Sequence, residues 1–418
     1  MNRLDKYIKQ IRGISYNPKD ISEVQLEDYL PILKANNIQE NGLETSSLIY
    51  IHKSKIKEEQ LIKKGDLLLA ASSGSKDIVG KNVFFEDDFN GSFGAFCKVV
   101  RPNENIYPRF LSVFFKTPLY KRHIRNLIQG ANINNLRNED IDSLKIPMFS
   151  QQDQLHIANL LSIAENLISL RKQSIALLDE CLKSTFLEMF GDPVRNEKGW
   201  EMSELKNYAK VRIGPFGSLM HREDYVQNGV PLVNPSHIRE GKIFIDSDLT
   251  ISKEKMKELS AYIMHEGDVV LGRRGEIGRC AVVTQNEEGF LCGTGSIFIR
   301  PTKALNPIFL YNVISSASLR KVLENLAKGI TMKNLNSGIV EDLKIPVPPL
   351  SLQIRFVQVV EKTEALKAYY QRSLKELENL YGSLSQRAFR GELSLNQSEE
   401  GVLMAAEPET GYHANIIK

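Results

Sequence analysis

Cysteine is scarce in this sequence. Only four cysteines occur in 418 residues. None belongs to a Cys-x-x-Cys pair and no His-x₃₋₅-His partner lies nearby, which argues against a zinc site and against a disulfide framework. We interpret the four residues as buried free thiols. They are Cys97, Cys181, Cys280 and Cys292.

Long apolar runs are missing as well. No run reaches the 18 or so residues of a membrane-spanning helix. The first residues, MNRLDKYIKQ, lack the apolar core of a signal peptide, so we expect a cytoplasmic location. The 54 basic and 51 acidic residues give a net charge of +3. A nucleic-acid interface would therefore need a local concentration of positive charge.

Motifs for catalysis are also lacking. The sequence has no Gly-x₄-Gly-Lys-Ser/Thr loop, no His-Glu-x-x-His zinc motif and no Pro-Asp dipeptide of the kind found in metal-dependent nucleases. The nearest match to the Asn/Asp-Pro-Pro-aromatic motif of DNA amino-methyltransferases is NPSH (234–237), which lacks the second proline and the aromatic residue. The glycine-rich stretches SSGSK (72–76) and GRRGEIG (272–278) follow strand-like runs and open no helix pattern, so we interpret them as turns. Combined with the binding-like architecture described below, these absences favour a protein that is not an enzyme.

What the sequence does contain is an internal repeat. NLRNEDIDSLKIP (135–147) returns as NLNSGIVEDLKIP (334–346), at an offset of 199 residues. Gly65-Asp66 is matched by Gly267-Asp268 at an offset of 202, and the 199-residue offset continues from Gln154 and Gln353 to Phe190 and Phe389. The chain therefore consists of two copies of one unit of about 200 residues, which is too long a period for a solenoid.

Each copy begins with a mixed region. Short apolar runs such as DLLLA (66–70) and GSIFIRP (295–301) lie between turn residues and predict strands. A helical pattern covers residues 110–128. We predict an α+β fold with a mainly antiparallel sheet in each globular part.

Each copy ends in a long helix. The second contains apolar or small residues at alternating spacings of three and four, which is a coiled-coil seam, and the first keeps the same register. A single long helix with such a seam needs a partner, and the other copy supplies one if the two pack antiparallel. The predicted seam is Ile157, Leu160, Ala164, Leu167, Arg171, Ser174, Leu178, Cys181 and Thr185, with Phe356, Val359, Thr363, Leu366, Tyr370, Ser373, Leu377, Leu380 and Leu384.

The predicted organisation has five segments. Residues 1–150 and 191–349 are the two globular parts. Residues 151–190 and 350–391 are the two helices, and residues 392–418 form a polar, flexible tail.

Five stretches of the sequence have a recognisable type. In the second copy they are GPFGSLMHREDYVQNGVPLVNPSHI (214–238), EGDVVLGRRGEIGRCAVV (266–283) and GITMKNLNSGIVEDLKIPVPPLSLQ (329–353). In the first copy they are KKGDLLLAASSGS (63–75) and GANINNLRNEDIDSLKIP (130–147). Through these stretches the sequence resembles the specificity subunit of type I restriction–modification enzymes over about residues 1–392. One departure is MFSQQ (148–152), which stands where the second copy has the proline-rich VPPLS (347–351).

The resemblance implies two target recognition domains that read the two halves of a bipartite, asymmetric DNA target, separated by spacer helices. It implies two modification (methyltransferase) subunits and motor–nuclease restriction subunits as partners. S-adenosylmethionine, ATP and Mg are expected on those partners, with no cofactor, metal or catalytic residue on this chain. A coiled-coil scaffold that binds proteins without DNA specificity, or an enzyme with an unrecognised site, remains the alternative.

The residues expected to contact DNA are basic, amide and hydroxyl side chains on glycine-bounded loops, because such groups read base edges and phosphates. In the first globular part they are Ser72, Ser73, Ser75, Lys76, Asn132, Asn134 and Asn135. In the second they are Asn234, Ser236, His237, Arg273, Arg274, Arg279 and Lys333.

Overall fold

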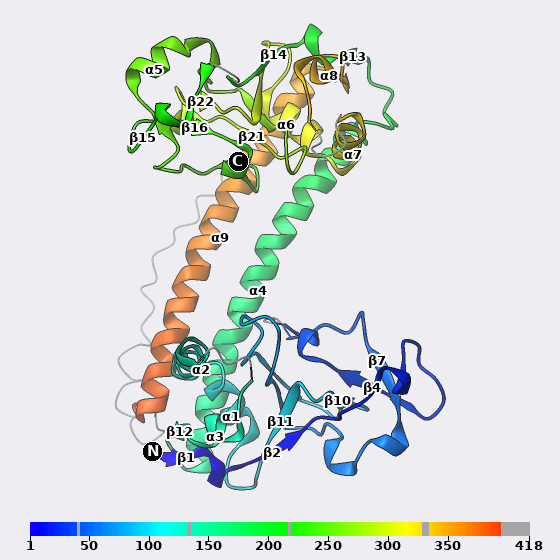
Figure 1. Cartoon of the computed structure of the whole chain (residues 1–418), viewed down its shortest axis with the longest axis vertical. Helices are drawn as coiled ribbons and strands as arrows, with labels where there is room; N and C mark the ends of the chain where they lie inside the picture. The colour runs from blue at the N-terminus through cyan, green and yellow to red at the C-terminus, as the bar shows by residue number, and fades with distance from the viewer. Residues whose placement is uncertain (40–41, 132–134, 216–218, 328–333, 394–418) are drawn as a thin grey trace, which may run out of the picture. The chain divides into compact units, whose positions relative to one another are not determined.

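The computed structural model describes residues 1–39, 42–131, 135–215, 219–327 and 334–393 (Figure 1). The chain divides into two compact units. Unit 1 consists of Met1–Ser174 with Tyr370–Lys418, and unit 2 is Ile175–Tyr369. Each unit thus contains one globular part and a segment of each long helix. None of the helices in the described ranges has the length and apolar character needed to span a membrane.

Unit 1 contains two four-stranded sheets, in the orders β2-β11-β8-β9 and β10-β4-β7-β3, and two short strand pairs, β1-β12 and β5-β6. Among the described strands of this unit, every pairing is antiparallel except that of β4 with β10. The strands are β1 (Asn2–Arg3), β2 (Ile8–Arg12), β3 (Ile21–Ser22), β4 (Tyr29–Leu33), β5 (Ile38–Gln39), β6 (Gly42–Leu43), β7 (Ile49–His52), β8 (Leu67–Ala70), β9 (Asn82–Phe84), β10 (Ser92–Phe93), β11 (Cys97–Pro102) and β12 (Lys145–Ile146). The helices of the globular part are α1 (Pro108–Phe114), α2 (Pro118–Ala131) and α3 (Asn138–Asp142).

Unit 2 repeats this topology, with sheets β14-β23-β20-β21 and β15-β19-β16-β22 and pairs β13-β24 and β17-β18. Its one parallel pairing among the described strands is β16 with β22. The strands are β13 (Met202–Glu204), β14 (Ala209–Ile213), β15 (Tyr225–Val226), β16 (Val230–Val233), β17 (Ile238–Arg239), β18 (Lys242–Ile243), β19 (Thr250–Ile251), β20 (Val269–Gly272), β21 (Cys280–Val282), β22 (Leu291–Cys292), β23 (Ser296–Pro301) and β24 (Lys344–Pro346). The helices are α5 (Lys253–Glu258), α6 (Pro307–Ser315), α7 (Ala317–Leu326) and α8 (Ser337–Glu341). The predicted α+β fold with mainly antiparallel sheets is confirmed.

We call β8 in unit 1 and β20 in unit 2 the central strand of each unit, and this strand is buried on both faces. In β8, Leu67 and Leu69 belong to the hydrophobic core formed with α1, whereas Leu68 and Ala70 belong to the core on the opposite face. Figure 1 shows this layering in unit 1, with α1 and α2 beside the long helices, then β2 and β11, then β4 and β7. Burial on both faces explains why the sequence of this strand is an unbroken apolar run instead of an alternating one.

The repeated Gly-Asp motif provides a buried ion pair at the start of that central strand. Asp66 is 1% exposed and accepts two hydrogen bonds from Arg101, from Nε to Oδ1 and from Nη2 to Oδ2, each 2.7 Å. Asp268 and Arg300 form the same pair in unit 2, at 2.8 and 2.7 Å. Such a two-pronged contact is among the strong hydrogen-bonded pairs of proteins, and it links β8 to β11 and β20 to β23.

A repeated glutamine joins each long helix to its globular part. The Gln154 Oε1 accepts a hydrogen bond from the backbone N–H of Tyr107 at 2.8 Å, directly before α1. The Gln353 Oε1 accepts one from Asn306 at 2.8 Å, directly before α6. The joint is therefore alike in both units, although MFSQQ replaces VPPLS in the first copy.

The long helices are α4 (Gln151–Phe190) and α9 (Leu350–Arg390), and they run antiparallel inside each unit. In unit 1, the Tyr381 hydroxyl, near the end of α9, donates to Glu165, near the start of α4, at 2.9 Å. In unit 2 the ring of Phe190, at the end of α4, lies 5.5 Å from that of Phe356, near the start of α9. Each unit therefore contains the beginning of one helix and the end of the other, as the coiled-coil prediction requires.

The predicted seam is confirmed at every second position. Of the eight positions between these, four are half-buried and four are exposed, and the exposed ones are Leu167, Cys181, Leu366 and Leu380. Leu167 is 46% exposed and Leu380 is 50% exposed, whereas Leu161 is fully buried. A seam whose steps run three then four residues and one whose steps run four then three both repeat every seven residues. Because α4 has apolar residues at the seam positions of both arrangements, the sequence pattern did not distinguish them. The positions of the four-three arrangement, all buried or half-buried, are Leu161, Ile168, Ile175 and Leu182 in α4, with Val360, Lys367, Leu374 and Tyr381 in α9.

The prediction of buried thiols also needs one correction. Cys97, Cys280 and Cys292 are buried, and burial raises the pKa of both the Cys97 and the Cys280 thiol to about 12. Cys181 is exposed, because it occupies one of the seam positions that the four-three arrangement turns toward solvent.

Candidate nucleic-acid interface

Three chain segments of unit 1 meet where the central strand ends. The backbone N–H groups of Ala71 and Ser72 donate to the carbonyl of Phe96 at 2.9 and 3.0 Å. On the other side, the N–H of Leu136 donates to the carbonyl of Ala71 at 2.7 Å, and Ser72 pairs with Asn135. We call residues 71–76, 94–96 and 135–136 the unit-1 loop cluster.

The same three segments meet in unit 2. The N–H of Arg273 donates to the carbonyl of Gly295 at 3.0 Å, and the N–H of Leu335 donates to the carbonyl of Arg273 at 3.1 Å. Residues 273–279, 293–295 and 334–335 are the unit-2 loop cluster. The repeated Asn-Leu motif thus has a structural role in both units, since its leucine N–H holds this segment beside the loop that follows the central strand.

The unit-1 loop cluster presents small polar side chains. Ser72 and Ser73 are half-buried, while Ser75, Lys76 and Asn135 are exposed. The Ser73 hydroxyl accepts a hydrogen bond from the N–H of Ser75 at 3.1 Å, which stabilises the turn. The structure therefore brings together five of the seven residues expected to contact DNA in the first globular part.

The unit-2 loop cluster contains three arginines in different environments. Arg273 is only 8% exposed and its Nε donates to Asn334 Oδ1 at 2.8 Å. Burial, together with the charge of Arg274, lowers the pKa of the Arg273 guanidinium from its usual value. Arg274 is exposed, and Arg279 is half-buried in an ion pair with Glu276. Of the three, Arg274 is the one whose placement suits a direct contact with DNA, and Arg273 supports the cluster from inside.

The stretch NPSH adjoins the unit-2 loop cluster but contributes unevenly. The N–H of Gly293 donates to the carbonyl of Val233 at 2.9 Å, which places Asn234 next to the 293–295 turn. Ser236 is exposed and Asn234 is half-buried. His237 is 6% exposed, with Nδ1 2.9 Å from the Leu232 carbonyl oxygen, so the structure assigns it to the interior and not to the surface expected of a DNA-contacting residue.

Sequence reasoning overlooked the counterpart of this stretch in unit 1. Lys34 and Asn36 stand where unit 2 has Asn234 and Ser236, and Asn36 is exposed. Asn37 occupies the place of His237 and accepts a hydrogen bond from the N–H of Lys34 at 2.8 Å. The signal was the match of KANNI (34–38) to NPSHI (234–238), which share only their last residue. Three other candidates, Asn132, Asn134 and Lys333, lie outside the described residues.

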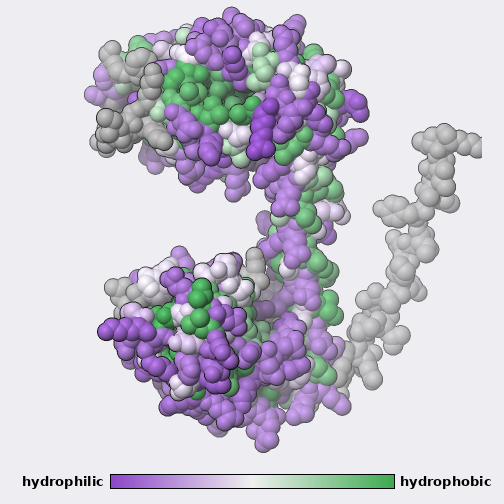
Figure 2. Space-filling view, turned by 90° about the vertical axis from the view of Figure 1, so that its right-hand side faces the viewer, coloured by the Kyte–Doolittle hydropathy of each residue, from purple (hydrophilic) through white to green (hydrophobic). Residues whose placement is uncertain are grey.

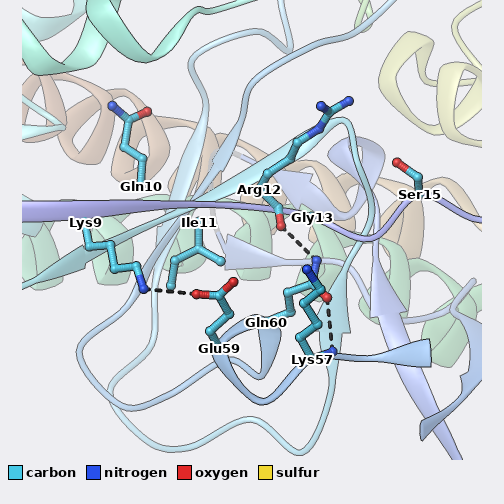
Figure 3. A pocket seen from close by; sticks show the side chains of 9 residues that line it. All are labelled: Lys9, Gln10, Ile11, Arg12, Gly13, Ser15, Lys57, Glu59 and Gln60. Atoms are coloured by element: carbon cyan, nitrogen blue, oxygen red, sulfur yellow. Dashed lines mark hydrogen bonds and ion pairs between the residues drawn. The ribbon is translucent and has the colours of Figure 1, made fainter. Parts of the chain in front are cut away.

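A basic cavity of about 420 Å³ lies at the edge strand β2, against residues Glu58–Gln60 (Figure 3). Lys9 and Glu59 form an ion pair across it at 3.0 Å, and Gln60 Nε2 donates to the Arg12 carbonyl at 3.0 Å. Figure 3 shows the guanidinium of Arg12 extending away from Glu59. Arg12 pairs in register with Lys98, on the strand that follows Phe96, so positive charge adjoins the unit-1 loop cluster. No sequence motif marks this cavity.

Comparison with known proteins identifies a family model and several proteins that match this chain. A family model described as the type I restriction modification DNA specificity domain matches residues 9–180 and again residues 197–379. The type I restriction enzyme EcoKI specificity subunit of Escherichia coli (strain K12) is 28% identical over 408 residues, which cover 92% of this chain and 87% of that protein. The StySPI specificity subunit of Salmonella potsdam is 28% identical over 407 residues, with the same coverage of 92% and 87%.

Solved structures share the fold. The S subunit of a type I restriction-modification system from M. genitalium aligns with a TM-score of 0.53 and 15% identity, over 93% of this chain and 95% of that chain. A chain from a structure of complex assembly and conformational transition of the type I R-M system aligns with a TM-score of 0.60 and 17% identity, over 94% and 97%. The doubled domain, the antiparallel helix pair and the matches over nearly the whole chain agree, and the chain belongs to the family of type I restriction modification DNA specificity domains.

Proposed function

We propose that this chain is the sequence-specific DNA-recognition subunit of a type I restriction–modification complex. Each globular part, residues 1–150 and 191–349, reads one half of a bipartite DNA target. The observation that supports this most directly is that two loop clusters with one backbone arrangement carry different side chains. Ala71 and Ser72 of unit 1 stand where unit 2 has Arg273 and Arg274. Different side chains read different base edges, so the two half-sites differ and the target is asymmetric.

The chain itself carries no catalytic role in this proposal. It acts in the cytoplasm with two methyltransferase subunits and with restriction subunits, which bind S-adenosylmethionine, ATP and Mg. The chain supplies the recognition surfaces and the docking surface, and the partners supply the chemistry.

An apolar stripe on the long helices supports docking of the methyltransferase subunits. Ile163, Leu167 and Leu170 on α4 are 59%, 46% and 58% exposed, at spacings of four and three. Leu366, which stands 199 residues after Leu167 on α9, is 40% exposed in unit 2. Figure 2 shows hydrophobic residues interspersed with hydrophilic ones on the surface of the helices. Such spacing suits a further amphipathic helix, and the exposed leucines at equivalent positions of the two units, Leu167 and Leu366, suit two copies of one partner.

The helix pair sets the spacing of the two half-sites in this proposal, and an insertion tests it. Four residues inserted after Ser174 lengthen α4 by about 6 Å and rotate it by about 40°. The coiled coil absorbs such an insertion by local unwinding. Methylated adenines are then mapped at base resolution in cells with the parent or the variant subunit. We expect unchanged half-sites and a gap longer by about one to two base pairs, at about 3.4 Å per pair.

The mapping experiment also separates this function from its alternatives. A pure interaction scaffold predicts no salt-sensitive DNA binding by the complex and no bipartite methylation pattern. An unchanged gap, or a changed half-site, would show that the helices do not determine the spacing.

A further inference from the structure

Phe96 is an exposed aromatic residue at the centre of the unit-1 loop cluster. It lies in the turn Gly94–Cys97, closed by a hydrogen bond of 2.8 Å from the Cys97 N–H to the Gly94 carbonyl. Its own carbonyl accepts from Ala71 and Ser72, so the backbone is held at three points. The side chain nevertheless remains 66% exposed. Because the backbone is fixed, the exposed ring is preorganised for contact with a binding partner.

Unit 2 has the same turn without the ring. The N–H of Ser296 donates to the carbonyl of Gly293 at 3.0 Å, and Gly295 occupies the place of Phe96. A Cβ at Gly295 would come within 2.9 Å of Pro235 Cδ, so the space above this turn is already filled. In unit 1 the residue in the place of Pro235 is Ala35, which is smaller. The two units therefore differ at this point by one large apolar side chain on a shared backbone.

Position, and not exposure, makes Phe96 informative, because single exposed apolar residues are common on proteins. Its backbone carbonyl accepts from the N–H of Ser72, and Ser72 pairs through its backbone with Asn135, so a hydroxyl-bearing and an amide-bearing residue belong to the same cluster. The strand that follows the turn carries Lys98 beside Arg12. Hydroxyl, amide and cationic groups suit the polyanionic, hydrogen-bonding surface of DNA better than the surface of a protein.

We propose that Phe96 makes an apolar contact with the 5-methyl group of a thymine in the half-site read by unit 1 and thereby sets specificity at that base pair; this rests on the proposed function. The phenyl ring has no hydrogen-bond donor or acceptor for a base edge. The thymine methyl is the apolar group that base pairs present in the major groove, and phenylalanine is among the side chains that contact it. Unit 2, with Gly295 in this place, reads its half-site without such a contact.

The test is a binding cycle with the intact complex of this chain and its methyltransferase subunits. The duplex carries the target mapped in cells, and each thymine of the first half-site is replaced in turn by deoxyuridine, which removes only the methyl group. The parent should lose about fourfold in affinity at one thymine, as expected for one buried methyl group. Phe96→Ser should bind the unmodified target more weakly than the parent and show no further loss when that thymine is replaced. Phe96→Leu should fall between the two.

Val24→Ser is the matched control, because Val24 is 64% exposed in the loop between β3 and β4 of the same unit. It should bind and discriminate like the parent. Discrimination in the second half-site, measured on the same complexes, verifies assembly, and unchanged discrimination at the other base pairs of the first half-site verifies that unit 1 is folded.

Several results would overturn the proposal. One is a Phe96→Ser complex that keeps the parent's affinity and its full sensitivity to deoxyuridine at every thymine. Another is a first half-site that contains no A·T pair. Weaker assembly with the methyltransferase subunits at unchanged DNA discrimination would assign Phe96 to a protein contact instead. If the parent complex itself shows no preference for the mapped target, the proposed function fails, and that outcome requires no variant.

Discussion

The two units differ little in their interiors and considerably at their loop clusters. Asp66 pairs with Arg101 as Asp268 pairs with Arg300, with contacts of 2.7–2.8 Å in both. In the loop clusters, by contrast, Phe96 stands where unit 2 has Gly295. Contacts that hold the backbone are retained in both copies, while side chains that face solvent vary. A duplicated fold of this kind separates the scaffold from the residues that we propose contact DNA.

Exchanging most of one globular part should change one half of the target. If residues from about 14 to 130 are replaced by those of another family member, the half-site read by unit 1 should change and the other should stay. Each mismatched base pair costs about 1–3 kcal/mol of binding free energy, so the complex should lose most of its preference for the original target. Base-resolution mapping of methylated adenines measures this. A change in both half-sites would disprove independent reading by the two units.

Removing the shared ion pair should destabilise both units alike. Asp66→Ala leaves Arg101 without its partner, and breaking a buried pair in this way costs about 3–5 kcal/mol. Asp268→Ala should do the same in unit 2. Calorimetry should show the altered unit unfolding at lower temperature than the other. Asp87→Ala is the control, because Asp87 is 90% exposed and 3.6 Å from Lys64 and should leave both transitions unchanged. An equally small effect of Asp66→Ala would contradict a scaffold role.

Placing a charge in the apolar stripe should remove one methyltransferase subunit from the complex. Leu167→Asp alters α4 in unit 1, and Leu366→Asp alters the equivalent position of α9 in unit 2. Loss of a buried leucine contact costs about 1.5–3 kcal/mol. Mass measurement of the assembled complex should give one bound methyltransferase subunit for each single variant and none for the double variant. Retention of two subunits by the double variant would exclude the stripe as the docking surface.

The two neighbouring arginines of unit 2 should behave differently. If the Arg274 side chain contacts guanine, Arg274→Ala should weaken DNA binding by about 1–3 kcal/mol and reduce sequence specificity at one base pair. If it contacts phosphate, the substitution should reduce the salt slope, which is the dependence of the logarithm of the binding constant on the logarithm of the salt concentration, by about one. Arg273→Ala should instead lower the stability of unit 2, because the hydrogen bond to Asn334 is lost. Titrations at several salt concentrations and thermal unfolding distinguish the two effects. Undiminished affinity of Arg274→Ala would remove this loop from the interface.

The smallest effect is expected at the basic cavity of unit 1. Arg12→Ala should weaken binding to all sequences equally and reduce the salt slope by about 0.9, the value for one phosphate contact. Arg12→Lys should retain most of the slope. A changed base preference in Arg12→Ala would show that this residue reads a base edge instead.

Much of the architecture follows from local patterns. The offset of 199 residues identified the duplication, and uninterrupted helical sequence after Pro147 predicted α4, which begins at Gln151 and ends at Phe190. Such features depend on neighbours in the sequence, since a helix forms from contacts three and four residues apart. The candidate loops were found for the same reason, because turn residues mark them directly.

The loop clusters, however, are assembled by contacts between distant parts of the chain. The proximity of Phe96 to Ser72, the burial of Arg273 against Asn334 and the choice of Leu161 over Leu160 in the seam each depend on a partner from another segment. A polar residue in a turn has the same local sequence whether its side chain faces solvent or the interior. The sequence alone therefore determined the two-copy plan and the secondary structure, and tertiary packing decided which side chains face outward, because burial is a property of the neighbours that folding brings together.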